Sequence, residues 1–183
     1  MNTLKAIIKG AIALLRKPKL RLFGNRVGKR VEICKGAYLT HCLIGNYNYV
    51  GMYSYLNHVK IGNYCSISGY VTIGAMEHDY NGVSTSTFLN KNGYNDRQTT
   101  IGNDVWIGAQ TVVRQGVSIG NGAVIGANTF VNKDIPPYAI AFGSPVKIYK
   151  YRFMEKDIRK IIESSFWDLS PKDAQVIINK LEL

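Results

Sequence analysis

Histidine is the side chain best suited to moving a proton near neutral pH, because its unperturbed pKa is about 6.5. The chain has three histidines, and only His78 lies beside the long stretch in which an otherwise regular pattern is lost. Glu77 and Asp79 flank it, so that either carboxylate could orient its ring. His41 and His58 match no motif and are interpreted as ordinary surface or coil residues. His78 is therefore the histidine to consider as a general base, although a histidine beside a loop, taken alone, is more often structural.

The pattern that breaks at His78 is a six-residue repeat, clearest between positions 101 and 132. Its first position holds large aliphatic residues, namely Ile101, Ile107, Val113, Ile119, Ile125 and Val131. The next position is glycine except at Arg114 and Asn132, and the position four after the aliphatic residue is small or β-branched. A period of six fits neither an α-helix nor simple strand alternation, and it predicts a solenoid of short strands with tight corners. Glycine is expected at such corners because some of them need a positive φ.

The repeat begins less regularly at Ile33, and it stops after His78. Five-residue steps separate Leu39 from Ile44 and Leu56 from Ile61. Residues 79–100 keep no period, and a loop of this length in a solenoid is usually functional or disordered. Tyrosines cluster in the first coils and could line a sugar-binding wall, form a subunit interface or cover the surface: Tyr47, Tyr49, Tyr53, Tyr55, Tyr64 and Tyr70.

The N-terminal segment carries most of the net charge of +11, since residues 1–30 hold nine basic side chains and no acidic one. Apolar residues at helical spacing predict an amphipathic helix over residues 3–16. It either caps the end of the solenoid or lies on anionic lipid, touching a membrane through residues 1–20. It is too short to span a bilayer, which takes roughly 20 apolar residues. The basic run lacks interleaved aromatic residues, so nucleic-acid binding is not expected.

Helical spacing returns after the repeat and predicts a helix over residues 154–165. A second helix is expected to begin after Ser170, with Pro171 at its first position, and the two helices would shield the edge of the last coil. The predicted division is a basic arm at 1–30, a repeat domain at 31–150 that extrudes loop 79–100, and a helical tail at 151–183.

The three cysteines form no CxxC pair and no even disulfide framework, which favours a cytoplasmic location. If the arm binds lipid, we expect the protein at the inner face of the cytoplasmic membrane.

Three motifs resemble those of the hexapeptide-repeat acyltransferases, which fold as left-handed parallel β-helices. They are His78-Asp-Tyr-Asn-Gly-Val-Ser-Thr85, Ile101-Gly-Asn-Asp-Val-Trp-Ile-Gly108, and Lys133-Asp-Ile-Pro-Pro-Tyr138 followed by Gly143-Ser-Pro-Val-Lys147. Within that superfamily the chain is similar to the branch of xenobiotic (chloramphenicol and streptogramin) acetyltransferases and sugar O-acetyltransferases. The resemblance covers residues 33 to 170 or so and leaves the N-terminal arm unexplained.

The resemblance implies a homotrimer with active sites between subunits, acetyl-CoA as co-substrate, no metal, and His78 as general base. A backbone N–H at Gly108 or its neighbours would stabilise the oxyanion. The remaining residues implied in CoA binding are Ala109 and Ala127 for the pantetheine arm, Asn132 and Lys133 as polar contacts, and Lys147 and Lys150 for the nucleotide phosphates. Tyr53 and Tyr80 are the candidates for binding the acceptor.

The expected function is transfer of acetyl to a hydroxyl of a sugar or cell-surface polysaccharide precursor. The alternatives are a xenobiotic acetyltransferase, for which the basic arm has no evident use, and an aminosugar N-acetyltransferase, which the same base would serve. Carbonic anhydrases of one class share the fold but hold zinc with three histidines that include a close pair, and this chain has no such pair. A non-catalytic solenoid that serves as an assembly module is the remaining alternative.

Overall fold

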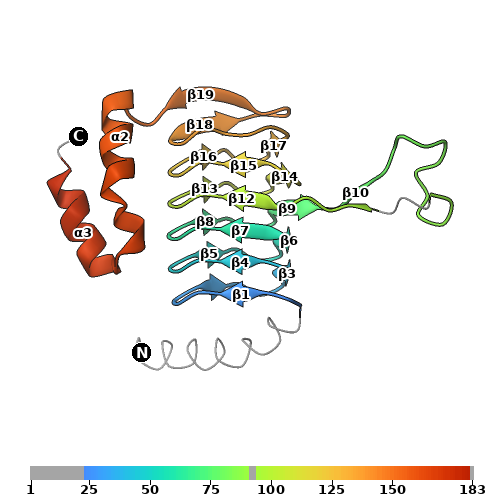
Figure 1. Cartoon of the computed structure of the whole chain (residues 1–183), viewed down its shortest axis with the longest axis horizontal. Coiled ribbons are helices and arrows are strands. Elements are labelled where there is room, and N and C mark those ends of the chain that lie inside the picture. Colours follow the sequence, from blue (N-terminus) through green and yellow to red (C-terminus); the bar gives the residue numbers. More distant parts are fainter. Residues whose placement is uncertain (1–22, 91–93, 182–183) are drawn as a thin grey trace.

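The computed structural model describes residues 23–90 and 94–181, which build a parallel β-solenoid with two helices along one side (Figure 1). A mainly β solenoid with C-terminal helices is thus confirmed. Its left-handed sense stays what the resemblance implies. The helix expected over residues 3–16 and the membrane contact expected through residues 1–20 lie outside the described residues. Within the described ranges, no helix is long and apolar enough to cross a membrane.

Short strands follow one another around three faces of the solenoid, and each pairs with its counterparts in the coils above and below. The first face holds β1 (Arg26–Val27), β4 (Leu43–Ile44), β7 (Val59–Ile61), β12 (Thr99–Ile101) and β15 (Ser118–Ile119). The second face holds β2 (Glu32–Ile33), β5 (Tyr49–Val50), β8 (Ser66–Ile67), β13 (Trp106–Ile107), β16 (Val124–Ile125) and β18 (Ala139–Phe142). The third face holds β3 (Tyr38–Thr40), β6 (Tyr55–Asn57), β9 (Thr72–Ala75), β14 (Val112–Arg114) and β17 (Phe130–Val131). We name the corners 1–2, 2–3 and 3–1 after the faces that they join.

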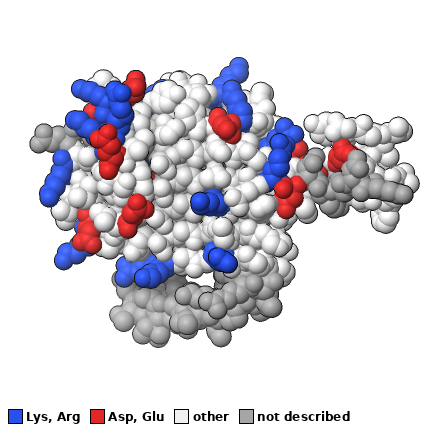
Figure 2. Space-filling model, viewed as in Figure 1, with Lys and Arg blue, Asp and Glu red and all other residues white. Residues whose placement is uncertain are grey.

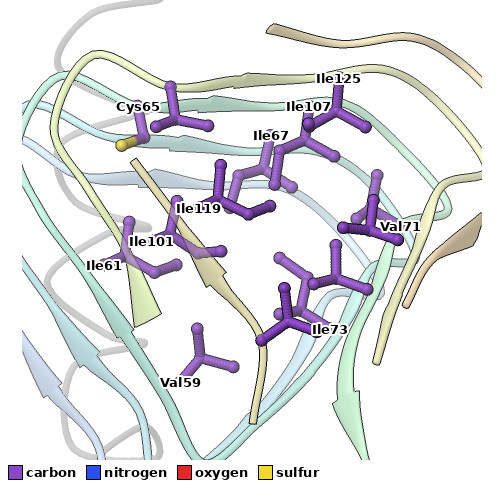
Figure 3. Packing of buried hydrophobic residues seen from close by; sticks show 14 of the residues in the cluster. Val59, Ile61, Cys65, Ile67, Val71, Ile73, Ile101, Ile107, Ile119 and Ile125 are labelled. Carbon is purple, nitrogen blue, oxygen red and sulfur yellow. The ribbon is translucent and has the colours of Figure 1, made fainter. Parts of the chain in front are cut away.

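The aliphatic positions of the repeat point inward and stack on one another through the whole solenoid. Ile67, Ile107 and Ile125 are direct partners on the second face, and each is at most 1% exposed (Figure 3). The five-residue steps shorten the first coils, so that Tyr49 pairs with Ser66, 17 residues later. Trp106 instead pairs with Val124, 18 residues later. Cys65 is buried in this core, as the small-residue position predicts.

Glycine at the second position of the repeat is explained mainly by the close approach of the next coil. A Cβ added to Gly108 would lie 2.5 Å from the backbone nitrogen of Ala127. Among the glycines that follow an inward aliphatic residue, Gly74 alone has a positive φ, of 69°. The expectation that some of these glycines need a positive φ therefore holds at Gly74, and the close approach of the next coil accounts for the others. Positive φ falls instead on residues further into each corner: Tyr47, Tyr53, Tyr64, Tyr70, Asp104, Gln110 and Asn128.

Side chains at the corners satisfy backbone groups of the neighbouring coil. At corner 1–2, the side-chain oxygens of Asn46, Asn63, Asn103 and Asn121 each accept the N–H of the matching residue one coil earlier, at 2.7–2.8 Å. The clustered tyrosines stack between coils, with ring centroids 4.8 Å apart for the pair Tyr47 and Tyr64. These contacts give the tyrosines a role in covering the coil surface.

A hairpin strand, rather than a helix, covers the edge of the last coil. Strand β19 (Lys147–Tyr151) pairs antiparallel with β18, which corrects the expectation that helices shield this edge. Helix α2 (Glu155–Ser164), the 3-10 turn η1 (Phe166–Asp168) and helix α3 (Pro171–Lys180) lie along corner 1–2 (Figure 1). There the hydroxyl of Tyr64 donates to the carbonyl of Leu169 at 2.7 Å.

The capping of α3 agrees with the sequence prediction. Ser170 is its N-cap and Pro171 its first residue, and the Ser170 side chain accepts the Asp173 N–H at 3.4 Å.

Replacing Gly51 by alanine tests the close-approach explanation, because the added Cβ would lie 2.4 Å from the carbonyl carbon of Ser68. We expect a loss of about 1–3 kcal/mol in the free energy of unfolding, measured by chemical or thermal denaturation. Gly82→Ala is the matched control, since its nearest neighbour, Asn90 Nδ2, lies 3.7 Å away. If Gly51→Ala unfolded together with wild type, coil spacing would not be the reason for glycine here.

Candidate active site

A two-stranded ribbon projects from corner 3–1, where the six-residue repeat breaks (Figure 1). It is formed by β10 (Glu77–His78) and β11 (Tyr94–Asn95), which run antiparallel with Glu77 opposite Asn95. The chain returns to the first face at β12, where Thr99 pairs with Val59 of the coil below. The stacking of coils therefore continues across the insertion, and the ribbon carries the candidate base outward from a rigid support.

The imidazole of His78 is oriented by a backbone carbonyl. Its Nδ1 lies 2.7 Å from the carbonyl oxygen of Thr85, further along the same loop. A carbonyl oxygen only accepts hydrogen bonds, so Nδ1 must carry the proton and donate. In the neutral ring, Nε2 then holds the lone pair and can accept a proton, as a general base must. The His78 side chain is exposed, which leaves it accessible to an acceptor.

The two carboxylates that flank His78 make other contacts. Glu77 receives two hydrogen bonds from Arg114, at 2.6 Å from Nε and 2.7 Å from Nη2. Asp79 Oδ1 accepts from the backbone and side-chain nitrogens of Asn81, at 3.0 and 2.9 Å. Thr85 was missed by sequence reasoning, because a backbone carbonyl gives no side-chain signal.

The ribbon is also held on its returning side. Asp96, which follows β11, lies 3.0 Å from His58 Nδ1 of the coil below. The backbone N–H of Arg97 donates to the side-chain oxygen of Gln115 at 2.9 Å. His58, interpreted from the sequence as an ordinary coil residue, thus lies at the root of the ribbon. Basic and acidic side chains lie next to one another at this root (Figure 2).

The guanidinium of Arg114 holds the pKa of Glu77 below its usual 4.5, chiefly through the two hydrogen bonds that it donates. The pKa of Arg114 is raised by the same contact, with a smaller contribution from Tyr80. Tyr80, a candidate for acceptor binding, is exposed and lies two residues after the candidate base. The other candidate, Tyr53, stacks on Tyr70 at corner 2–3, with centroids 5.4 Å apart, on another corner of the coil.

The residues implied in CoA binding do not all lie at the same corner of the solenoid. Ala109 and Ala127 lie one above the other at corner 2–3, and within the described chain neither backbone N–H has a hydrogen-bond partner. The N–H of Gly108 donates to the carbonyl of Ile125 at 2.8 Å. This N–H thus belongs to the ladder between coils, and an oxyanion donor at Gly108 or its neighbours stays a prediction.

The polar and basic candidates lie elsewhere on the coils. Asn132 and Lys133 follow β17 at corner 3–1, on the same side as the ribbon. Lys147 and Lys150 are exposed on β19, and the Lys150 ammonium lies 5.9 Å from the centre of the Tyr149 ring. Lys and Arg side chains gather over α2 and the nearby end of β19, interspersed with acidic ones (Figure 2).

An open hollow of about 610 Å³ lies on the first face, between Thr100, Ser118 and Asp134, and none of the predicted site residues lines it. In the described part of the chain, no cluster of three or more His, Cys, Asp or Glu side chains could hold a metal ion.

Residues 41–75 and 98–133, on both sides of the ribbon, match the family described as bacterial transferase hexapeptide (six repeats). Both segments therefore carry the hexapeptide repeat of this family. The family resemblance drawn from the motifs is thereby confirmed.

Two curated relatives of this hexapeptide-repeat protein are acetyltransferases. A chloramphenicol acetyltransferase from Escherichia coli is 35% identical over 118 residues, which are 57% of this chain and 56% of the relative. A galactoside O-acetyltransferase from Escherichia coli strain K12 is 47% identical over 51 residues, 28% of this chain and 25% of the relative. The chain spans from 33% to 56% of the length of the chloramphenicol acetyltransferases that it matches.

A solved structure shares the fold of this hexapeptide-repeat protein. AntD, an N-acyltransferase from Bacillus cereus in complex with dTDP and 3-hydroxybutyryl-CoA, superposes with a TM-score of 0.66 over 76% of each chain. The two chains are 24% identical, so this likeness is one of fold.

The ion pair between Glu77 and Arg114 makes stability depend on pH. A carboxyl whose pKa is lowered in the folded state stabilises the fold above its unfolded pKa, and this is lost as pH falls through the folded pKa. Wild type should therefore melt above Glu77→Gln at pH 7, and the difference should shrink as pH falls below about 4.5 and disappear once the pH is below the lowered pKa of Glu77. The exposed Glu163 of α2 provides the control Glu163→Gln, expected to stay within about 0.5 kcal/mol of wild type. An equal melting temperature for wild type and Glu77→Gln at pH 7 would contradict this account.

Proposed function

We propose that this hexapeptide-repeat protein is an acetyl-CoA-dependent O-acetyltransferase, with His78 as general base and a sugar or cell-surface polysaccharide precursor as acceptor. The observation that carries the proposal is the hydrogen bond from His78 Nδ1 to the Thr85 carbonyl. It selects the tautomer in which Nε2 can take a proton. Such a base is needed because a free hydroxyl is too weakly acidic to attack a thioester at neutral pH.

In the proposed reaction, Nε2 of His78 accepts the proton of the acceptor hydroxyl while the hydroxyl oxygen attacks the carbonyl carbon of the acetyl thioester. The carbon–sulfur bond then breaks. The imidazolium returns its proton to the sulfur that leaves, which restores the base for the next cycle. The Thr85 carbonyl keeps the ring in one orientation in both steps, because Nδ1 stays protonated throughout.

Ala109 and Ala127 are proposed to hold the pantetheine arm of acetyl-CoA. Their N–H groups, which are unpaired among the residues that the structure describes, lie one coil apart on an exposed corner, and both side chains are small enough to let an extended chain approach. Amide carbonyls of pantetheine would supply the missing acceptors. Asn132, Lys133, Lys147 and Lys150 remain candidates for polar and phosphate contacts, since all four side chains are exposed.

A homotrimer with sites between subunits is part of the proposal. In one chain, the alanine pair lies at corner 2–3 and the ribbon leaves from corner 3–1, at opposite ends of the third face. A neighbouring copy could bring its own alanine corner to the ribbon. The basic arm, if it binds anionic lipid, would hold the enzyme at the inner face of the cytoplasmic membrane, close to lipid-linked saccharides.

A sugar acceptor is supported by the match to galactoside O-acetyltransferase and by the basic arm. The second candidate is acetylation of a xenobiotic such as chloramphenicol. It is favoured by the match to chloramphenicol acetyltransferase, which extends over 118 residues rather than 51.

The proposal is tested by measuring CoA release from acetyl-CoA with a panel of saccharides, aminosugars, chloramphenicol and a streptogramin. Wild type should turn over at least one saccharide, and His78→Ala should lose about 10²–10⁴-fold in kcat/KM because the proton acceptor is gone.

His41→Ala is the matched control, because it removes an exposed imidazole that bonds the Thr40 hydroxyl at 3.0 Å and has no part in the ribbon. Its activity should equal that of wild type. Full activity of His78→Ala would exclude this base, and turnover of antibiotics alone would favour the second candidate.

A further inference from the structure

Arg114 breaks the repeat at a position where the neighbouring hexads have glycine. Gly108 and Gly120, one hexad to either side, are glycine because a Cβ would lie 2.5 and 2.4 Å from the backbone of the next coil. At Arg114 the pairing with β9 is irregular: Val113 lies opposite Ile73, but Arg114 lies opposite Ala75. Arg114 therefore lies where the pairing of β14 with β9 loses its register, and a long side chain at this position needs an explanation other than coil packing.

The extra residue on β9 is Gly74, and its conformation directs the chain outward into the ribbon. Its φ is 69°, and an added Cβ would lie 2.2 Å from the carbonyl oxygen of Asn57. The side-chain nitrogen of Asn57 donates to the Gly74 carbonyl at 3.0 Å and fixes the bulge. Bulges next to functional sites commonly re-aim a side chain, and this one places Arg114 beside the outgoing strand of the ribbon.

From that position Arg114 binds both carboxylate oxygens of Glu77, at 2.6 and 2.7 Å. The two side chains are 34% and 28% exposed, so the pair is partly shielded from water. Two parallel bonds fix direction as well as distance, which a single bond or a lysine would not. Ala75 ends β9 and Glu77 begins β10 two residues later, so a side chain opposite Ala75 is near enough to reach Glu77.

The neighbouring residue holds the other strand of the ribbon. The side-chain oxygen of Gln115, a residue only 2% exposed, accepts the backbone N–H of Arg97 at 2.9 Å. Two consecutive residues of one coil thus hold the outgoing strand and the returning strand. His78 directly follows Glu77, so any rotation of β10 moves the imidazole away from the Thr85 carbonyl.

We infer that Arg114 is a positioning residue: through Glu77 it fixes strand β10, so that His78 keeps Nδ1 on Thr85 and presents Nε2 to the acceptor. The consequence for activity rests on the proposed function, but the orientation of the ring can be measured without any substrate. Arg114 acts through Glu77 on the base and not on acetyl-CoA. Its loss should therefore lower kcat and leave KM for acetyl-CoA nearly unchanged.

The test compares Arg114→Gln, Glu77→Gln and the double variant with wild type. The first readout is ¹⁵N NMR of the His78 imidazole, assigned with His78→Ala. Wild type should show the Nδ1–H tautomer, and both single variants should shift toward the Nε2–H form that a free imidazole in water prefers. The second readout is kcat on the best acceptor, which should fall about 10- to 100-fold in each single variant. The double variant should be no worse than the single ones, because both remove the same contact.

Arg159→Gln is the matched control, because Arg159 also pairs with a glutamate, Glu155 on α2 at 3.5 Å, but far from the ribbon in the fold. It should keep the wild-type tautomer and kcat. Arg114→Lys retains the positive charge but cannot donate two parallel hydrogen bonds as a guanidinium does, so it should recover only part of the lost kcat.

An unchanged tautomer in folded Arg114→Gln would overturn the inference, whatever the activity. So would a loss of activity that appears in KM for acetyl-CoA with kcat preserved. If the tautomer shifts as expected while wild type acetylates nothing in the panel, positioning by Arg114 stands and the proposed function fails. Melting temperatures of all variants show whether the fold is intact. If Arg114→Gln does not fold, the His78 tautomer is read instead from the NMR spectrum of Arg114→Lys.

Discussion

The direct stacking of each residue on its counterpart in the next coil governs the rest of this structure. Inward residues stack on residues of the same type, as Ile67, Ile107 and Ile125 do, and backbone hydrogen bonds run from coil to coil. The parallel strands of successive coils lie about 4.8 Å apart, which leaves no room for a Cβ at the glycine position. Any change of length within a face would shift all later contacts. Variation is therefore confined to the corners.

The three corners consequently have different roles in the structure. Corner 1–2 carries the asparagine ladder and the contacts to the C-terminal helices, such as that of Tyr64 with Leu169. Corner 2–3 presents Ala109 and Ala127 with unpaired N–H groups among the described residues. Corner 3–1 accepts the inserted ribbon without disturbing the register, since Thr99 still lies over Val59. A rigid coil on each side of the insertion is what allows a two-stranded ribbon to hold a side chain in a defined place.

The sequence predicted what depends on side-chain type and period. The core, the short first coils and the N-cap at Ser170 all follow from patterns along the chain. It could not predict the Thr85 carbonyl that orients His78, because every residue has a carbonyl and the contact depends on the path of the loop. Nor could it predict that the Gly108 N–H bonds to the carbonyl of Ile125, because this contact depends on a neighbour in space. Arg114 was visible only as an exception to the glycine pattern, and its partner could not be read from spacing.

The geometry of one coil also bears on how a complete site is built. From the corner at Ala109 the chain crosses the third face along β14 to Arg114, a path of at most about 16 Å for five extended residues. The ribbon then leads His78 further from the solenoid (Figure 1). Proton transfer needs the proton donor and the base within about 3 Å of each other, or joined by one bridging water. If the alanine corner holds acetyl-CoA, the thioester would have to cross that face to reach the base of its own chain. A ribbon that projects from one copy toward the alanine corner of another removes this gap, which supports an assembly in which each site takes its base and its acetyl-CoA corner from different subunits.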